Sequence, residues 1–119
     1  MKNLIYCPAE RAVYFLGGKW KIRILFSLFH NKKIRFGELK KGLKTITQQM
    51  LSKQLKELEA DGIVNREVIQ VMPPNVEYSL TGFGLSVIPI LKSFSEWNKR
   101  NTRTISVKLN KNFEENRIR

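Results

Sequence analysis

Cysteine, histidine and acidic residues are scarce in this chain of 119 residues. It has one Cys, Cys7, one His, His30, and 10 Asp and Glu against 22 Lys and Arg. A single Cys excludes an internal disulfide and favours a reducing compartment. No acidic cluster stands at ligand spacing, so no metal site is expected, and no pattern brings Cys7 and His30 together as nucleophile and base. We therefore expect neither an enzyme nor a cofactor.

Long hydrophobic runs are also absent. No apolar stretch approaches the roughly 20 residues of a membrane-spanning helix, and the N-terminus lacks the apolar core of a signal peptide. The expected location is therefore the cytoplasm, with no membrane partner. The length fits one domain with a modest core, and so small a core favours dimerisation.

The basic excess is large and unevenly distributed. The formal net charge is +12. Residues 1–60 contain 13 Lys and Arg against 4 Asp and Glu, whereas residues 61–119 contain 9 against 6. This balance favours a polyanionic partner, and DNA, RNA and membrane surfaces are all polyanions.

Residues 47–61 predict a helix with two unlike faces. At about 100° per residue, one narrow sector holds an apolar stripe of Leu51, Leu55 and Leu58. The opposite side is an exposed polar ridge, made of Gln49, Ser52, Lys53 and Lys56.

The sequence also predicts where this helix begins and ends. Thr47 is suited to cap its start, and Asp61-Gly62 supplies a C-terminal stop. A shorter amphipathic helix precedes it, with Phe36, Leu39 and Leu43 as its apolar residues. The turn between the two helices is short, which predicts a helix-turn-helix.

The chemistry of the polar ridge suits the DNA major groove. Gln can bond adenine edges, Ser can donate or accept, and Lys can reach guanine or phosphate. Gln48, Gln49 and Ser52 lie in the first turns, where such helices usually meet base edges. The alternative is a solvated helix face, which is what most polar stripes are.

A β-hairpin is predicted directly after this helix. Residues 63–71 and 76–80 alternate as strands do, and Met72-Pro73-Pro74-Asn75 forms a rigid turn between them. A helix-turn-helix followed by a hairpin is the winged-helix arrangement, whose tip can lie along the minor groove or the DNA backbone. The alternative is a plain turn without DNA contacts.

The remaining segments are mostly helical. We expect helices at residues 8–16 and 19–29, a very short strand at 34–35, and a long helix over residues 82–99 that Thr81 caps. The long helix has apolar residues every third position, which need cover from the first helices or from a second subunit: Leu85, Ile88, Leu91, Phe94 and Trp97.

The predicted fold class is α+β, mainly α. It is a winged helix-turn-helix, with a three-helix core and a two-stranded β-wing, extended by N- and C-terminal dimerisation helices. Residues 1–100 form this domain. Residues 101–119 are a C-terminal tail, for which a short strand, a helix and a mobile segment are all open.

Four motifs occur in an order that resembles the HxlR family of bacterial winged helix-turn-helix transcriptional regulators, which are similar to MarR-type regulators. They are CPAERAVYFLGGKWKIRIL, RFGELKKGL, ITQQMLSKQLKELEADGIV and PPNVEYSLTGFG, and the likeness covers about residues 7–97. The resemblance implies a homodimer, usually a repressor, that is formed largely by its first and last helices. A two-fold dimer favours a palindromic operator with half-sites about one helical turn apart.

The resemblance also implies which residues meet DNA and which meet the second subunit. Residues 47–61 correspond to the recognition helix and residues 73–75 to the wing tip. The predicted DNA-binding residues are Arg35, Thr47, Gln48, Gln49, Ser52, Lys53, Lys56, Pro73, Pro74 and Asn75. The predicted dimer interface contains Val13, Leu85, Ile88, Leu91, Phe94 and Trp97.

Several such regulators respond to oxidants or reactive electrophiles through a cysteine near the N-terminus, the place that Cys7 occupies. Cys7 precedes Pro8 at a helix N-terminus, with Arg11 one turn along, and both features favour the reactive thiolate. Reaction of Cys7 with an oxidant or electrophile would give a Cys7–Cys7 bridge between subunits, a mixed disulfide with a small thiol, or a direct adduct. The alternative is a small residue that packs at the dimer edge.

Two functions remain open at this point. The first is a sequence-specific, dimeric DNA-binding regulator, with a small-molecule or electrophile effector as a further partner. The alternative is a winged-helix module that binds protein or RNA. Single-stranded RNA recognition usually exposes aromatic side chains for base stacking, and the polar ridge has none.

Overall fold

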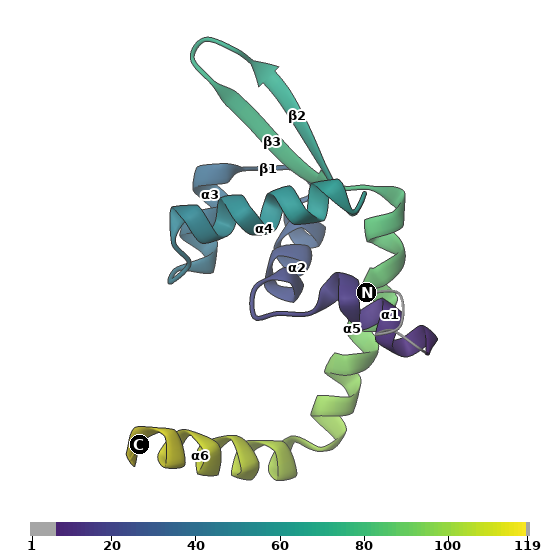
Figure 1. The fold of residues 1–119 in the computed structure, drawn as a ribbon, viewed down its shortest axis with the longest axis vertical. Coiled ribbons are helices and arrows are strands. Elements are labelled where there is room, and N and C mark those ends of the chain that lie inside the picture. Colours follow the sequence, from purple (N-terminus) through teal and green to yellow (C-terminus); the bar gives the residue numbers. More distant parts are fainter. Residues whose placement is uncertain (1–6, 119) are drawn as a thin grey trace. The chain divides into compact units, whose positions relative to one another are not determined.

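The computed structural model describes residues 7–118, with side chains through residue 111. The chain forms two compact units, residues 1–88 and 89–119, and one long helix continues across the division. Figure 1 shows the elements in order: α1 (Pro8–Leu16), α2 (Lys21–Asn31), β1 (Ile34–Arg35), α3 (Phe36–Leu43), α4 (Gln48–Ala60), β2 (Val64–Gln70), β3 (Asn75–Leu80), α5 (Gly82–Arg100) and α6 (Thr102–Ile118). The predicted class, mainly helical with a small sheet, is confirmed.

The core of the first unit lies among α2, α3, α4 and the base of the hairpin. Each of these elements contributes branched aliphatic side chains that are almost fully buried. Burial of one such side chain is worth about 1.5–3 kcal/mol, so these residues supply much of the stability of the unit. The core residues are Ile24, Leu25, Leu28, Leu39, Leu51, Leu55, Leu58, Ile63 and Val64.

The sheet has three antiparallel strands in the order β1-β3-β2. Ile34 of β1 pairs with Tyr78 of β3, which confirms the predicted short strand beside the wing. Strands β2 and β3 form the wing, with Val64 opposite Leu80 at its base. The wing is therefore joined to the helical core at its base, through β1 and Val64.

Thr81 connects the base of the wing to the start of α5. Its hydroxyl accepts a hydrogen bond from Gly84 N at 3.0 Å and donates to Gly62 O at 2.6 Å. Its backbone amide donates to Ile63 O at 3.0 Å. The predicted cap is confirmed, and the same residue fixes where α5 leaves the hairpin.

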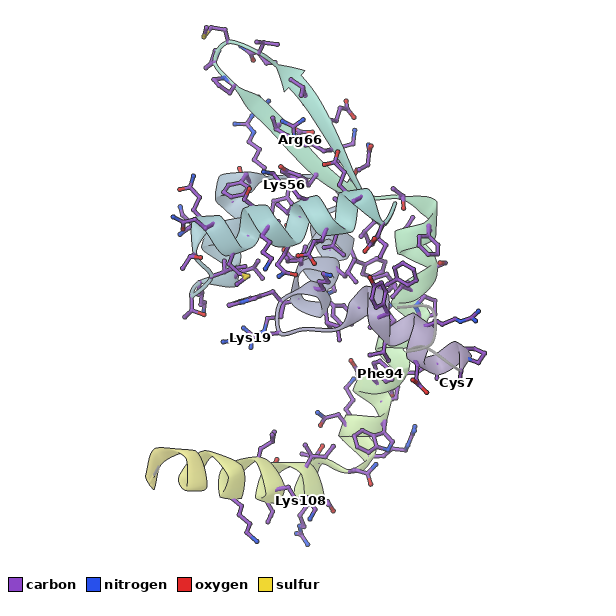
Figure 2. All side chains as sticks on the ribbon, in the orientation of Figure 1. Cys7, Lys19, Lys56, Arg66, Phe94 and Lys108 are labelled. Atoms are coloured by element: carbon purple, nitrogen blue, oxygen red, sulfur yellow. The ribbon has the colours of Figure 1, made fainter. Side chains whose placement is uncertain are left out.

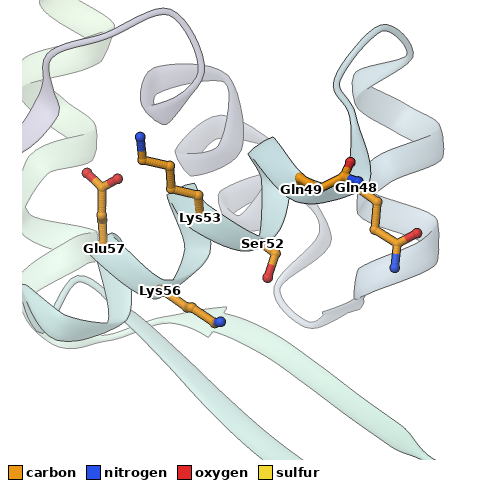
Figure 3. A pocket seen from close by; sticks show the side chains of 6 residues that line it. All are labelled: Gln48, Gln49, Ser52, Lys53, Lys56 and Glu57. Atoms are coloured by element: carbon orange, nitrogen blue, oxygen red, sulfur yellow. The ribbon is translucent and has the colours of Figure 1, made fainter.

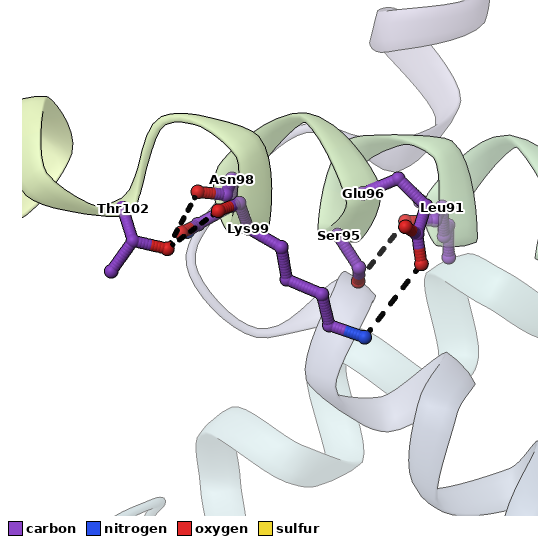
Figure 4. Close-up of polar contacts among 6 residues, drawn as sticks. All are labelled: Leu91, Ser95, Glu96, Asn98, Lys99 and Thr102. Atoms are coloured by element: carbon purple, nitrogen blue, oxygen red, sulfur yellow. Dashed lines mark hydrogen bonds and ion pairs between the residues drawn. The ribbon is translucent and has the colours of Figure 1, made fainter.

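The second unit consists of the later turns of α5 and of α6. Of the three alternatives for the tail, the structure shows the helix. At the junction, Thr102 Oγ1 donates to the carbonyl oxygens of Asn98 and Lys99, each at 3.0 Å (Figure 4). The break between α5 and α6 falls at Asn101, whereas the division of domains at residue 100 stays a prediction.

Candidate nucleic-acid interface

Helix α4 is held in place at both ends by hydrogen bonds that its sequence supplies. Met50 N donates to Thr47 Oγ1 at 3.1 Å, which confirms Thr47 as the N-cap. At the other end, Gly62 takes a φ of 75°, Gly62 N donates to Glu59 O, and Ile63 N donates to Leu58 O at 2.9 Å. This pair of bonds is a Schellman motif, which needs a left-handed residue at Gly62. The helix axis is thereby fixed against the hairpin.

The outer face of α4 lines an open hollow of about 700 Å³. Figure 3 shows its six side chains along the helix: Gln48, Gln49, Ser52, Lys53, Lys56 and Glu57. The structure therefore brings the polar ridge and Gln48 together on one surface. Leu51, Leu55 and Leu58 are buried on the opposite face, so the ridge cannot turn inward without exposing them.

Glu57 is part of this surface although the sequence pattern does not indicate it. Its Oε1 lies 3.1 Å from Lys21 Nζ at the start of α2, and the two side chains are 43% and 9% exposed. A carboxylate beside DNA phosphate is repulsive, and the buried ammonium of Lys21 offsets that charge. The net stability gained from such a pair is small, but removing either partner leaves the other charge poorly compensated.

A second basic group lies at the N-terminal end of α2. Lys19 Nζ is 5.0 Å from the centre of the Trp20 ring, and Arg23 Cζ is 5.1 Å from it. Trp20 is buried, so it presents a fixed aromatic surface to two exposed cations. Cations over an indole ring are favourably placed, by roughly 0.5–1 kcal/mol at exposed sites.

Arg35 and the wing tip also come together. Residues from the start of α3 and from the tip line a second hollow of about 300 Å³: Arg35, Phe36, Gly37, Pro74, Asn75 and Val76. The side-chain oxygen of Asn75 is buried and has no hydrogen-bond partner among the described residues. Three predicted DNA-binding residues, Arg35, Pro74 and Asn75, therefore share one surface, whereas Pro73 is exposed at the tip.

Arg66 is a further candidate, absent from the residues that the sequence predicts. It lies opposite Tyr78, which in turn pairs with the buried Ile34, so all three side chains share one face of the sheet. Arg66 is also two residues from buried Val64, and side chains alternate along a strand. Figure 2 labels Arg66 on the wing and Lys56 on α4. Alternation from Val64 was the available signal, but the face becomes certain only with the strand register.

Cys7 is the N-cap of α1, as predicted, but its neighbour differs from the expected one. Glu10 N donates to Cys7 Sγ at 3.4 Å, and the thiol donates to Glu10 Oε1 at 3.3 Å. The expected partner, Arg11, contacts Cys7 through its backbone amide, which donates to Cys7 O. The thiol proton is thus held by a carboxylate.

A family model described as HxlR-like helix-turn-helix matches residues 15–106. The chain belongs to this family. It is 48% identical to the uncharacterized HTH-type transcriptional regulator YybR of Bacillus subtilis over 95 residues, which are 80% of this chain and 75% of YybR. The redox regulator HypR in its reduced form has a TM-score of 0.79 at 44% identity, covering 85% of this chain and 99% of that chain. The reduced form of YodB from B. subtilis has a TM-score of 0.70 at 31% identity, covering 80% and 93%.

Membership of the HxlR-like family decides between the two functions left open by the sequence. The relatives are transcriptional regulators, not enzymes, and the helix-turn-helix is the DNA-binding element of such proteins. This HxlR-like protein is therefore a DNA-binding transcriptional regulator. In the described part of the chain, no helix is long and apolar enough to cross a membrane, and no His, Cys, Asp and Glu cluster could hold a metal ion.

The predicted dimer-interface residues of this HxlR-like chain differ in exposure, and the interface itself stays a prediction. Ile88 and Leu91 are only 3% and 1% exposed. Steps of three residues turn about 300° on a helix, so the predicted stripe winds round α5 instead of following one face. The other predicted positions are exposed: Val13, Leu85, Phe94 and Trp97.

Proposed function

We propose that this protein is a homodimeric repressor that binds a palindromic operator with one α4 in each of two successive major grooves. The observation that carries the proposal is the face of α4. Gln48, Gln49, Lys53 and Lys56 are exposed along one surface, while the opposite face is locked into the core by its buried leucines. Because the proposed partner is DNA, we propose that the protein acts in the cytoplasm.

The surrounding groups divide between base reading and phosphate contact. Gln48, Gln49 and Ser52 occupy the first turns of α4, where their amide and hydroxyl groups suit base edges. Lys53 can reach guanine or phosphate. Phosphate contacts suit the remaining cations, because long basic side chains on the flanks position a protein without reading sequence: Arg35, Lys56 and Arg66.

Removing two of the ridge side chains tests this assignment. Gln49→Ala with Lys53→Ala is expected to weaken binding to the operator by about 100-fold, since each good base contact is worth about 1–3 kcal/mol. The probe is the duplex enriched from a random-sequence library by the wild-type protein, and fluorescence anisotropy gives Kd at fixed salt.

The matched control is Asn110→Ala with Lys108→Ala. It removes the same amide and the same charge from exposed positions on α6. We expect its Kd to stay within about threefold of the wild type, since surface charges act weakly at a distance when screened. Equal losses in both double variants would show that α4 contributes charge alone and does not read bases.

Exposed apolar residues support the dimer. Helix α1 has no buried side chain, although Val13, Tyr14 and Phe15 make it strongly apolar. A nine-residue helix is marginal unless its apolar face is packed. In the later part of α5, Ile90, Phe94 and Trp97 stand at i, i+4 and i+7 and are all exposed, as one face of a helix. A second copy of the chain would cover these faces.

We further propose that oxidation of Cys7 releases the operator. Support comes from the position of the thiol at the start of α1 and from two similar solved structures, the redox regulator HypR and the reduced form of YodB. Because the chain has one Cys, oxidation joins Cys7 to the same residue of a second subunit or to a small thiol. Two thiols then lose two protons and two electrons to the oxidant.

Diamide is expected to weaken operator binding of the wild type by at least about tenfold, and Cys7→Ser should abolish this effect. Dithiothreitol should restore binding. Unchanged release by diamide in Cys7→Ser would refute the sensing role and leave DNA binding by α4 intact.

A further inference from the structure

The distal part of the wing has no charge, although the chain carries a net charge of +12. Residues 68–76 read VIQVMPPNV, and the flanking charged residues, Glu67 and Glu77, lie opposite each other in the strand register. Val71 and Met72 are 78% and 83% exposed, the largest values among the exposed large hydrophobic side chains of the described residues. A tip that held phosphate would need basic side chains. This tip is suited to an apolar contact.

The wing tip has a defined shape before any partner binds. Gln70 Nε2 donates to Met72 O at 3.0 Å across the turn. The rings of Pro73 and Pro74 restrict the backbone next to Met72, and Pro74 also lines the hollow beside the start of α3. Little conformational entropy is therefore lost when the tip makes a contact.

We propose that Val71 and Met72 form an apolar wedge that enters the DNA minor groove and partly unstacks a base step outside each half-site. The inference rests on the proposed function, in which α4 occupies the adjacent major groove. Met and Pro are among the side chains that minor-groove proteins insert between base steps. The wedge reads how easily DNA deforms and forms no hydrogen bonds to base edges.

DNA is the occupant because the tip continues the surface that the proposed function assigns to DNA. The wing follows α4 after the short turn at Gly62, and Arg66 lies on the hairpin between α4 and the tip. Arg66 can hold the phosphates at the rim of the groove while the uncharged tip enters it. Glu67 and Glu77 lie on the opposite face of the hairpin from Arg66, since side chains alternate along each strand.

The apolar wedge predicts a particular base sequence outside the half-sites of the operator. Pyrimidine–purine steps such as TA and CA/TG unstack and kink easily, whereas A-tracts are stiff. The operator should therefore carry flexible steps at a fixed distance outside the two half-sites. These positions make no contact with the polar ridge.

The test is a parallel selection from one random-sequence duplex library, with the wild-type protein and with Val71→Ser/Met72→Ser. Both proteins should enrich the same half-sites, but the flanking TA or CA/TG steps should be enriched by the wild type alone. On the duplex recovered with the wild type, the variant should bind about tenfold more weakly and bend the DNA less, as end-to-end fluorescence transfer reports. The dependence of affinity on salt should stay unchanged, because no phosphate contact is lost.

Two comparison variants keep the result interpretable. Ile69→Ser makes a similar change to an exposed side chain two residues before the wedge, within β2, and should leave the flanking steps enriched. Arg66→Ala should reduce the salt slope by about 1, as the loss of one phosphate contact does. Identical enriched sequences and equal bending in the wild type and the double variant would overturn the wedge while the proposed function stands.

Two other outcomes would also overturn it. If the double variant loses self-association in analytical ultracentrifugation and keeps DNA bending, the tip is a protein-binding surface. If the wild type enriches no sequence at all, the proposed function fails, and the wedge fails with it.

Discussion

Gly84→Ala is expected to destabilise the protein by about 3 kcal/mol, at the upper end of the usual cost of overpacking. A Cβ at this position would collide with the carbonyl oxygen of Ile63 and lie 3.2 Å from Leu80 Cδ2. The Ile63 carbonyl cannot move freely, because it accepts hydrogen bonds from both the amide and the hydroxyl of Thr81. The clash therefore separates the start of α5 from the base of the wing. Urea unfolding followed by circular dichroism measures the loss.

Gly82→Ala is the matched control for this substitution. Gly82 lies two residues earlier in the same helix, and a Cβ there meets nothing within 4 Å. Alanine also restricts the unfolded chain, so stability should stay the same or rise by up to about 1 kcal/mol. If both variants unfolded at the same urea concentration, close packing at Gly84 would not explain its need for glycine.

The two faces of α4 could be predicted from the sequence because helical geometry is local. The leucines at 51, 55 and 58 are separated by a fixed angle, and Thr47 and Gly62 mark the ends with side-chain and backbone chemistry of their own. No distant residue had to be known. The structure accordingly places the polar ridge at the surface where the pattern predicts it.

The sequence did not predict Glu57 and Arg66 as interface residues, because their placement depends on contacts between different elements. Glu57 enters the interface through an ion pair with Lys21, which is 36 positions away in the chain. The face of Arg66 depends on its pairing with Tyr78 across the hairpin, and a slip of one residue would reverse it. The ion pair of Glu57 is a tertiary contact that the sequence pattern does not indicate, whereas alternation from Val64 indicates the face of Arg66 only once the strand register is known.

For Cys7, the sequence contains a signal for the correct neighbour, but the charge argument favoured a different residue. A cap residue followed three positions later by Glu is the spacing of a capping box, and Glu10 stands at that position. The charge argument favoured Arg11, which is one residue further along. The geometry of the cap decides the neighbour, because the N3 side chain turns back toward the capping residue.

Phe94→Glu with Trp97→Glu should convert the dimer into a monomer and weaken operator binding by at least about 100-fold. Both side chains are more than half exposed in the single chain, at 55% and 58%, so their burial in a second subunit is what the charges would prevent. A dimer holds two half-sites at once, and losing the second contact removes the gain of about 10²–10⁴ that linkage provides. Light scattering gives the mass, and anisotropy gives Kd.

The control is Lys99→Glu, which changes the net charge by the same amount. Lys99 lies on the opposite side of α5 from Phe94, about 140° round the helix, and its side chain is 75% exposed. This variant should stay dimeric and bind the operator nearly as well as the wild type. A Phe94 and Trp97 variant that remained a dimer would move the subunit interface to α1 or α6. One that became a monomer with full operator affinity would instead show that a single α4 and its wing are enough to read the site.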